Sequence, residues 1–402
     1  MNLYPYQERA VTQLKNHNKG LLTLPTGAGK TIIFMSDAKS RINNSKSRMT
    51  FVIVAPRILL SEQLSDDFSE FMKDENVYIT NVHSGQDATT KVNEIQNHSA
   101  IADAMNMHHF IFTTYKSLHK INLSEIHIDV VYFDEAHHSV KPSNFVGIAH
   151  TSQVANNAYF FTATPKTSMK NSTDIYGSHI VSVSAKELLS VGTILPPEVE
   201  VYEHDFQRTK ENASLVDATN VTSIVKDIDQ EDAKILVAAP STKIIFESLS
   251  QTDMMKELND LGYIVMHITS KYGAFINKTK VSREVFFKRL NEYGADKNQK
   301  IIVFHHSILG EGINVTGLTH CIMLRNLPTI EMLQTIGRVI RIAKEDRTAI
   351  SNGELTPGQF SMYSKRCGKV IVPVSSGHGK TTQRKLQNVV NVVFNEGKTV
   401  FC

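Results

Sequence analysis

The segment Gly20–Thr31 constrains the fold of this chain more than any other part of its 402 residues. Leu21–Leu24 is a short apolar run bounded by glycine and proline, which predicts a buried parallel strand. A glycine-rich turn, Pro25–Gly29, leads from it into a segment with helical character, Ile32–Arg41. Glycines let several backbone N–H groups point at one place, and a helix N-terminus adds positive potential there. The sequence therefore predicts an anion-binding loop between a strand and a helix.

The anion expected at this loop is the phosphate chain of a nucleotide. Strand, glycine turn and helix in that order are the context that a phosphate-binding loop needs. Lys30 can then reach the β- and γ-phosphates, and the Thr31 hydroxyl can ligate Mg²⁺. The strict pattern has glycine where this chain has Leu24, and the alternative interpretation is an ordinary loop before a helix. The other loop residues expected to contact the nucleotide are Thr26, Gly27, Ala28 and Gly29.

The bulk composition limits the function classes. A chain of 402 residues suits two domains of about 200 residues each. The net charge is +3, so any nucleic-acid contact must come from local placement of basic residues. The three isolated cysteines indicate neither a zinc site nor a disulfide framework. No signal peptide or membrane-length apolar stretch is present, which predicts a soluble intracellular protein, cytoplasmic or nuclear, with no membrane partner.

Acidic and hydroxyl residues follow two further β-rich runs of the first half. Ile128–Phe133 leads directly into Asp134 and Glu135, and a later run ends in Thr162 and Thr164. The carboxyl ends of parallel strands face the ligand crevice. There Asp134 can hold Mg²⁺ through its water shell, and Glu135 can orient or deprotonate the water that attacks the γ-phosphate. The alternative, an acidic solvent-exposed turn, fits less well after an uninterrupted buried strand.

Strand-like and helix-like segments alternate along the whole chain, which predicts an α/β fold with doubly wound parallel sheets. Two prolines near Pro197 indicate a linker, so we expect one domain at 1–197 and a second at 198–402. The polar segment 343–366 is expected to be an irregular surface loop. The histidines His305 and His306 are expected to be polar loop residues and not metal ligands. The remaining strands are expected at Thr50–Ala55, Tyr78–Val82, Phe110–Tyr115, Glu198–Phe206, Lys234–Ala239, Tyr263–Ile268, Lys300–Phe304, Cys321–Leu324 and Lys369–Val374.

One segment of the second half has the residues of a phosphoryl clamp. On a helix, Gln334, Arg338 and Arg341 recur at i, i+4 and i+7 and share one face. Two guanidinium groups and an amide on one face can hold a phosphoryl group. The alternative is a helix face paired with acidic neighbours, but no acidic residue lies between Leu333 and Lys344. A second glycine-rich loop, Ser375–Thr381, lacks an acidic strand end nearby and is expected to be a basic loop.

These motifs, in this order, resemble those of superfamily 2 helicases of the DEAH/DExH kind, from Leu3 to about Ile342. Leu24 is ordinary in that family. The resemblance implies two tandem RecA-like parallel-sheet domains of the P-loop NTPase class, with ATP and Mg²⁺ between them. The segments that carry it are Tyr6–Gln7, Pro25–Thr31, Ala55–Arg57, Thr113–Thr114, Asp134–His137, Thr162–Thr164, Glu311–Asn314 and Gln334–Arg341.

The resemblance also implies residue roles. Gln7 would read adenine, Gly312 would lie at the nucleotide, and Arg338 and Arg341 would act as arginine fingers beside Gln334. Thr162 and Thr164 would couple hydrolysis to movement. The family often has aspartate where this chain has Asn314, which leaves the contact made by that position open. The residues implied to grip the nucleic-acid backbone are Arg57, Thr114, Ser241 and Thr242.

The function expected from these features is an ATP-dependent helicase or translocase that moves along or unwinds nucleic acid, with DNA favoured over RNA. Two alternatives stay open. One is a duplex-DNA translocase or restriction-type motor subunit that works with a nuclease or specificity partner and does not separate strands. The other is a nucleic-acid-sensing ATPase switch that clamps its substrate and signals to a partner.

Overall fold

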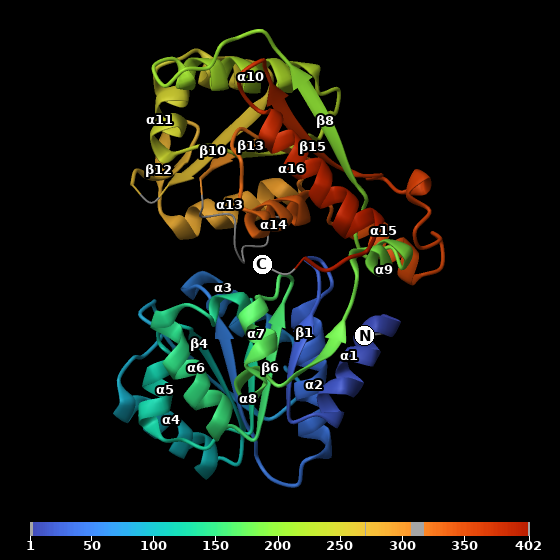
Figure 1. Ribbon diagram of the computed structural model, residues 1–402. Helices are drawn as coiled ribbons and strands as arrows, with labels where there is room; N and C mark the ends of the chain where they lie inside the picture. The colour runs from blue at the N-terminus through green and yellow to red at the C-terminus, as the bar shows by residue number, and fades with distance from the viewer. Residues whose placement is uncertain (1–2, 270, 307–316, 401–402) are drawn as a thin grey trace. The chain divides into compact units, whose positions relative to one another are not determined.

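The computed structural model describes residues 3–269, 271–306 and 317–400, and it divides into two compact units. The first runs to Ser184 and the second from Ala185 to Lys398 (Figure 1). Each unit has its own sheet with helices on both faces, which confirms the expected α/β fold with two RecA-like domains. The functional division at Pro197 stays a prediction. The short segment before it, from Ala185, already belongs to the second unit, and its Leu195 N–H donates to the Ile340 carbonyl at 2.8 Å.

The sheet of the first unit has the order β3-β4-β2-β5-β6-β1-β7, and every neighbouring pair is parallel. Parallel strands with both faces covered read as continuous apolar runs, which is why they could be recognised in the sequence. The strands are β1 (Lys19–Thr23), β2 (Thr50–Ala55), β3 (Val77–Val82), β4 (His108–Thr114), β5 (Val130–Phe133), β6 (Asn157–Thr162) and β7 (Ser178–Ser182).

Two kinds of packing cover this sheet. On one face aromatic rings dominate, and Phe34 stacks on Phe68 and Tyr132 with ring centroids 5.8 and 5.5 Å apart. The other cluster combines aliphatic side chains such as Ile95 and Ile148 with the stacked rings of Phe133 and Phe160, whose centroids lie 4.5 Å apart. The helices are α1 (Pro5–Asn16), α2 (Lys30–Asn44), α3 (Ile58–Phe71), α4 (Val92–Ala104), α5 (Leu118–Ser124), α6 (Pro142–Val154), α7 (Thr167–Asn171) and α8 (Thr173–Tyr176), with a 3₁₀ turn at Ala136–His138.

The sheet of the second unit has the order β12-β11-β10-β13-β9-β14-β15-β8. From β10 to β8 the neighbours are parallel, whereas β11 and β12 form an antiparallel hairpin at one edge. The strands are β8 (Pro197–Glu203), β9 (Lys234–Ala238), β10 (Tyr263–Thr269), β11 (Gly273–Ile276), β12 (Thr279–Val281), β13 (Lys300–His305), β14 (His320–Met323) and β15 (Gly368–Val374).

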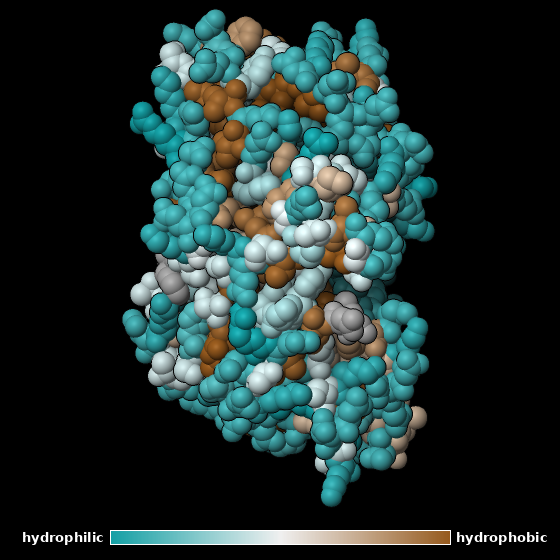
Figure 2. Space-filling model, turned by 90° about the vertical axis from the view of Figure 1, so that its right-hand side faces the viewer, coloured by the Kyte–Doolittle hydropathy of each residue, from teal (hydrophilic) through white to brown (hydrophobic). Residues whose placement is uncertain are grey.

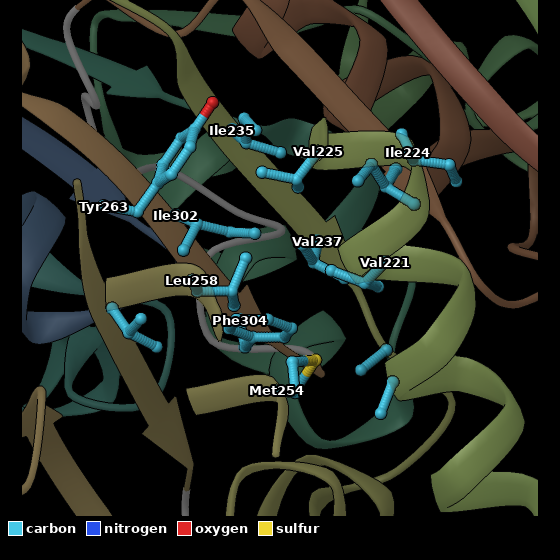
Figure 3. Packing of buried hydrophobic residues seen from close by; sticks show 14 of the residues in the cluster. Val221, Ile224, Val225, Ile235, Val237, Met254, Leu258, Tyr263, Ile302 and Phe304 are labelled. Atoms are coloured by element: carbon cyan, nitrogen blue, oxygen red, sulfur yellow. The ribbon is translucent and has the colours of Figure 1, made fainter. Parts of the chain in front are cut away.

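The core of the second unit forms between this sheet and the helices on one of its faces. Val221, Ile224 and Val225 of α10 face Ile235 and Val237 of β9 (Figure 3). The helices are α9 (Ala185–Ser190), α10 (Ala213–Asp227), α11 (Thr242–Ser250), α12 (Met254–Asp260), α13 (Arg283–Ala295), α14 (Thr329–Val339), α15 (Lys344–Ser351) and α16 (Lys380–Val390), with a 3₁₀ turn at Phe360–Met362 and a π-helical turn at Asn391–Asn395.

The segment 343–366 is more ordered than its polar sequence predicts, because α15 lies within it. Asp346 of α15 is buried and holds the end of the segment in place. Its carboxylate accepts hydrogen bonds from the Ser364 N–H and hydroxyl, both at 2.9 Å. The expectation of an irregular loop was therefore wrong over α15.

Lys365, at the end of this segment, joins three parts of the second unit. Its ammonium group donates to the carbonyls of Leu318, Val339 and Arg341 at 2.6, 2.5 and 3.1 Å. Val339 is the last residue of α14, where the carbonyls of a helix lack partners within the helix, and Arg341 follows two residues later. Burial lowers the pKa of Lys365 to about 7, whereas the three carbonyls favour the charged ammonium. Lys365 thus fixes the end of α14.

Replacing Lys365 by methionine should therefore destabilise the protein. The variant keeps most of the aliphatic volume but leaves three buried carbonyls without their shared donor, which should cost about 3 kcal/mol in the free energy of unfolding. Lys369→Met is the matched control, since Lys369 makes a half-exposed ion pair with Glu200, and its loss should cost less than about 1 kcal/mol. Urea unfolding monitored by circular dichroism measures both changes. Equal stability of the two variants would contradict the role given to Lys365.

The surface is mostly hydrophilic, as expected for a chain that buries many of its hydrophobic residues in two cores. Hydrophilic residues cover most of the face drawn in Figure 2, and hydrophobic ones show through in separate patches. Among the helices that the structure describes, none combines the length and the apolar character required to cross a membrane.

Candidate active site

The predicted phosphate loop and the acidic residues meet at one edge of the first sheet. Strands β5, β6 and β1 are adjacent, and their carboxyl ends carry Asp134, Thr162 and the loop. Thr23 pairs with Thr162, and the Leu24 N–H donates to the Thr162 carbonyl at 2.9 Å. The structure therefore brings together three motifs that are far apart in the sequence.

The loop has the backbone expected of a phosphate cradle. Gly27 and Gly29 have φ angles of +91° and +71°, a region that favours glycine, and α2 begins directly afterwards at Lys30. Leu24 and Ala28 are fully buried and anchor the two ends of the turn. The loop N–H groups at the start of α2 can thus bind an anion.

The first helix is attached to this loop. The Tyr6 hydroxyl and the Gln7 side-chain amide both donate to the Ala28 carbonyl at 3.1 Å. The Gln7 side-chain carbonyl accepts from the Tyr4 N–H at 3.0 Å. Gln7 therefore holds the loop in this structure. The adenine contact implied by the resemblance stays a prediction, because Gln7 would have to give up these hydrogen bonds to reach adenine.

The geometry at Gly29 leads to a testable prediction. A Cβ atom here would lie 2.7 Å from the Gln7 amide nitrogen, in a backbone region unfavourable for alanine. Gly29→Ala should raise the KM for ATP about tenfold, because the Gln7 amide that holds the loop must move away from the added methyl group and lose its hydrogen bonds. Gly262→Ala is the matched control, since Gly262 has a φ of +84° but no atom within 4 Å of the added Cβ. The control carries the same backbone strain, about 1 kcal/mol, and should leave the KM for ATP unchanged. An unchanged KM in Gly29→Ala as well would contradict the close contact.

Lys30 and Glu135 form the central contact of the site. The ammonium group lies 2.8 Å from the Glu135 carboxylate, and both side chains are nearly buried. Burial opposes the charge on Glu135, but Lys30 and His137 outweigh it and lower the pKa of this carboxyl. Burial and the adjacent Glu135 raise the pKa of Asp134. Two neighbouring carboxyls with opposite shifts are typical of sites that divide acid–base and metal-binding roles.

The residues present fit a magnesium ion that is held mainly by oxygen atoms outside the protein. Asp134 is buried at the strand end, and one of its carboxylate oxygens accepts a hydrogen bond from the Glu135 N–H at 2.9 Å. In the described ranges, no group of three or more His, Cys, Asp or Glu residues could hold a metal. Mg²⁺ usually keeps several waters and binds through one or two protein oxygens plus phosphate. The side chains of Asp134 and Thr31 carry such oxygens, and their binding of Mg²⁺ stays a prediction.

Glu135 connects this site to the end of β6. Its φ of +48° is unusual for a residue with a side chain, and such strain is concentrated at functional sites. His137 lies 3.4 Å from the Glu135 carboxylate and 3.2 Å from the Thr162 hydroxyl. The Thr164 N–H donates to the same hydroxyl at 3.1 Å. A chain of contacts thus joins the acidic residues to the threonines predicted to couple hydrolysis to movement.

Tyr115 belongs to this site, although the sequence analysis assigned it no role. Its buried hydroxyl donates to the Asp134 carbonyl at 2.8 Å and supports the acidic loop from the end of β4. The one available signal was its place directly after Thr113–Thr114 at a predicted strand end.

Two predicted nucleic-acid contacts of the first unit lie at the same sheet edge. Ala55 of β2 pairs with Thr114 of β4, and Arg57 follows two residues later at the start of α3. Thr114 also donates to the Ser117 hydroxyl at 3.3 Å. Their binding role stays a prediction.

In the second unit, Ser241 and Thr242 lie at the start of α11. The Ser241 hydroxyl accepts from the Ile244 N–H at 3.1 Å and so caps the helix. A capping role alone is enough to account for Ser241. Contact with nucleic acid therefore stays a prediction for both residues.

The predicted phosphoryl clamp is only partly on one helix. Gln334 and Arg338 are buried residues of α14, but this helix ends at Val339. Arg341 lies beyond it and forms an isolated backbone bridge with Ile194, so the expectation of three side chains on one helical face was wrong for Arg341. Burial lowers the pKa of Arg341 to about 10. Gly312 and the rest of Glu311–Asn314 lie outside the described residues.

Two smaller expectations can also be compared with the structure. His305 is the last residue of β13 and is buried, which lowers its pKa to about 3, so it was wrong to expect a loop histidine there. The second glycine-rich loop turns tightly, with the Ser375 N–H bonded to the His378 carbonyl at 2.9 Å. Gly379 has a φ of +86°, and an added Cβ would lie 2.2 Å from the Pro373 carbonyl. The loop passes so close to the end of β15 that a side chain at position 379 would clash with it, which explains the glycine on structural grounds.

Comparison with known families matches both halves of the chain. Residues 1–167 match the family model of the res subunit of type III restriction enzymes, and residues 219–343 match that of the helicase conserved C-terminal domain. No curated protein matches the sequence.

Several solved structures share the fold at low sequence identity. The ATP-dependent Type ISP restriction-modification enzyme LlaBIII, solved bound to DNA, has a TM-score of 0.70 and 16% identity over 98% of this chain and 30% of its own. The helicase Lhr of Mycobacterium smegmatis has a TM-score of 0.61 and 14% identity, and the match covers 99% of this chain and 49% of Lhr. Dbp5 of S. cerevisiae has a TM-score of 0.61 and 14% identity, and the match covers 100% of this chain and 90% of Dbp5. The chain thus spans about a third of the restriction enzyme and half of Lhr. The two family models, together with the motifs and the two sheets, support a superfamily 2 helicase core.

Proposed function

We propose that this protein is a nucleic-acid-dependent ATPase of the DEAH kind that uses ATP and Mg²⁺ to move along nucleic acid, with DNA favoured over RNA. The observation that carries the proposal is the Lys30–Glu135 ion pair at the sheet edge where the phosphate loop, Asp134 and Thr162 converge. A buried cation and a buried carboxylate beside a phosphate cradle are suited to phosphoryl chemistry.

The residues of the first unit would divide the work. The loop N–H groups bind the phosphates, and Lys30 exchanges its bond with Glu135 for a bond to the phosphate chain. Glu135 is thereby released to orient a water and accept its proton. Bound Mg²⁺, held through Asp134 and Thr31, would neutralise phosphate charge. The contacts of His137 with both Glu135 and Thr162 would pass a change at Glu135 to β6.

A second candidate is a duplex-DNA translocase that does not separate strands and works with a nuclease or specificity partner. It is favoured by the match of residues 1–167 to the res subunit of type III restriction enzymes and by the likeness to LlaBIII.

ATPase assays with single-stranded DNA, duplex DNA and RNA, paired with a strand-displacement assay, test these proposals. Stimulated hydrolysis with displacement supports the helicase. Stimulation by duplex DNA without displacement supports the translocase. Hydrolysis that no nucleic acid stimulates would contradict both.

A further inference from the structure

The β11–β12 hairpin departs from the strand–helix alternation of the second unit. It forms the outer edge of the sheet, and β12 has no neighbour on its far side among the described strands. Within its two strands only Ala274 is buried. Most residues of the hairpin are therefore at least partly exposed, although Phe275 stacks on His267 of β10.

The hairpin is strongly basic in an otherwise balanced chain. The segment 271–283 contains four basic residues and no acidic one, although the whole chain has 43 basic and 40 acidic residues. The side chains of Lys271, Lys278 and Lys280 are exposed. Since the net charge gives no general attraction to phosphates, this is the kind of local basic cluster that a nucleic-acid contact requires.

An aromatic pair lies at the base of the hairpin. Tyr272 stacks on Phe246 of α11, with ring centroids 4.7 Å apart and planes within 20°. The Lys271 ammonium lies 5.2 Å from the centre of the Tyr272 ring, and 40% of Phe246 is exposed. Glu247, the acid next to Phe246, already pairs with Lys243 at 3.5 Å. A stacked aromatic pair beside lysines is suited to a base and its flanking phosphates.

The position of the pair in the fold agrees with this chemistry. Phe246 lies on the helix that begins with Thr242, one of the predicted nucleic-acid contacts. Helix α11 and strand β12 lie at the same edge of the second unit (Figure 1). A nucleic-acid strand that contacts the start of α11 could therefore continue onto the hairpin.

We propose that Phe246, Tyr272 and the hairpin lysines Lys271, Lys278 and Lys280 form an accessory surface for single-stranded nucleic acid. A base stacks on the aromatic pair, and the ammonium groups neutralise the adjacent phosphates. This assignment rests on the proposed function, because it extends the path of a nucleic acid that the motor already holds.

A simpler explanation accounts for part of the pattern. Lysines on an edge strand prevent pairing with the edge of another chain, and Lys280 is placed for that purpose. Edge protection does not require an exposed aromatic ring stacked beside the lysines, since such a ring favours association. The combination of ring and charge therefore favours nucleic acid.

Binding of a labelled single strand of about 20 nucleotides, as DNA and as RNA, tests the surface by fluorescence anisotropy over a range of salt concentrations. Phe246→Ala should weaken binding about tenfold and leave the salt dependence unchanged, because stacking releases no counterions. Lys278→Ala with Lys280→Ala should weaken binding and reduce the slope of log K against log salt by about 1.4, since each phosphate contact on a single strand contributes about 0.7.

Matched controls are Phe206→Ala, another half-exposed ring, and Lys256→Ala with Lys344→Ala, two exposed lysines elsewhere in the second unit. Both should bind like the wild type, and thermal melting establishes that all variants fold. If the wild type binds and every variant binds equally, the surface assignment fails while the proposed function stands. New self-association of the lysine variant at unchanged affinity would assign the lysines to edge protection instead. If the wild type binds neither strand, both proposals fail.

Discussion

Glu135→Gln should lower kcat for ATP hydrolysis by about 10³-fold and leave ATP binding intact. General-base catalysis contributes about 10²–10⁴-fold, and an amide can position a water but cannot accept its proton. In the structure Glu135 holds Lys30 at 2.8 Å, so removing its charge also releases Lys30 for the phosphates. The Kd for ATP should therefore stay equal or become lower. Steady-state turnover and titration with a fluorescent ATP analogue measure the two effects separately.

Glu75→Gln is the matched control for this substitution. Glu75 pairs with Lys39 of α2 at 3.1 Å and lies outside the site, so its loss should change neither kcat nor the Kd for ATP. If Glu135→Gln kept more than a tenth of the wild-type kcat, Glu135 would not be the base. A large loss of ATP binding would mean that the Lys30–Glu135 ion pair stabilises the binding conformation of the loop and does not compete with the nucleotide.

The strands, and the meeting of the phosphate loop with Asp134 and Glu135 in the first unit, were predictable because the sequence patterns that indicate them are local. A buried parallel strand is a continuous apolar run, and the loop after β1 combines glycines with a following helix. Asp134 and Glu135 come directly after such a run, and strand adjacency brings them to Lys30. Parallel strands place their carboxyl ends at one edge, so adjacent strand ends converge whatever their separation in sequence.

What could not be predicted depends on long-range contacts or on single-residue boundaries. The order of α15 depends on the buried Asp346 and its bonds to Ser364, which no periodicity shows. Arg341 leaves the helical face because α14 ends two residues earlier. The hairpin was missed because its two strands are short and its alternation is weak, although Asn277, with a φ of +50°, marks the turn.

Lys30→Ala should abolish both ATP binding and hydrolysis, with the Kd for ATP at least 10²-fold higher and no measurable turnover. Lys30 would supply the charge that reaches the phosphates, so its loss removes binding energy as well as catalysis. Lys39→Ala is the matched control, because Lys39 lies on the same helix, is partly exposed and pairs with Glu75. This control should leave both measurements unchanged. Measurable turnover in Lys30→Ala would contradict the assignment of the site.

Loss of activity in Lys30→Ala could also follow from unfolding, and the ion pair itself provides the means to separate the two causes. Removing Lys30 leaves the buried Glu135 carboxylate without its cation, which should cost about 3 kcal/mol in the free energy of unfolding. Adding Glu135→Gln to the same chain removes that charge, so the double variant should recover most of the lost stability. It should still neither bind nor hydrolyse ATP, because the amide replaces no phosphate contact of Lys30. Recovery of ATP binding together with stability would instead mean that Lys30 serves only to neutralise Glu135.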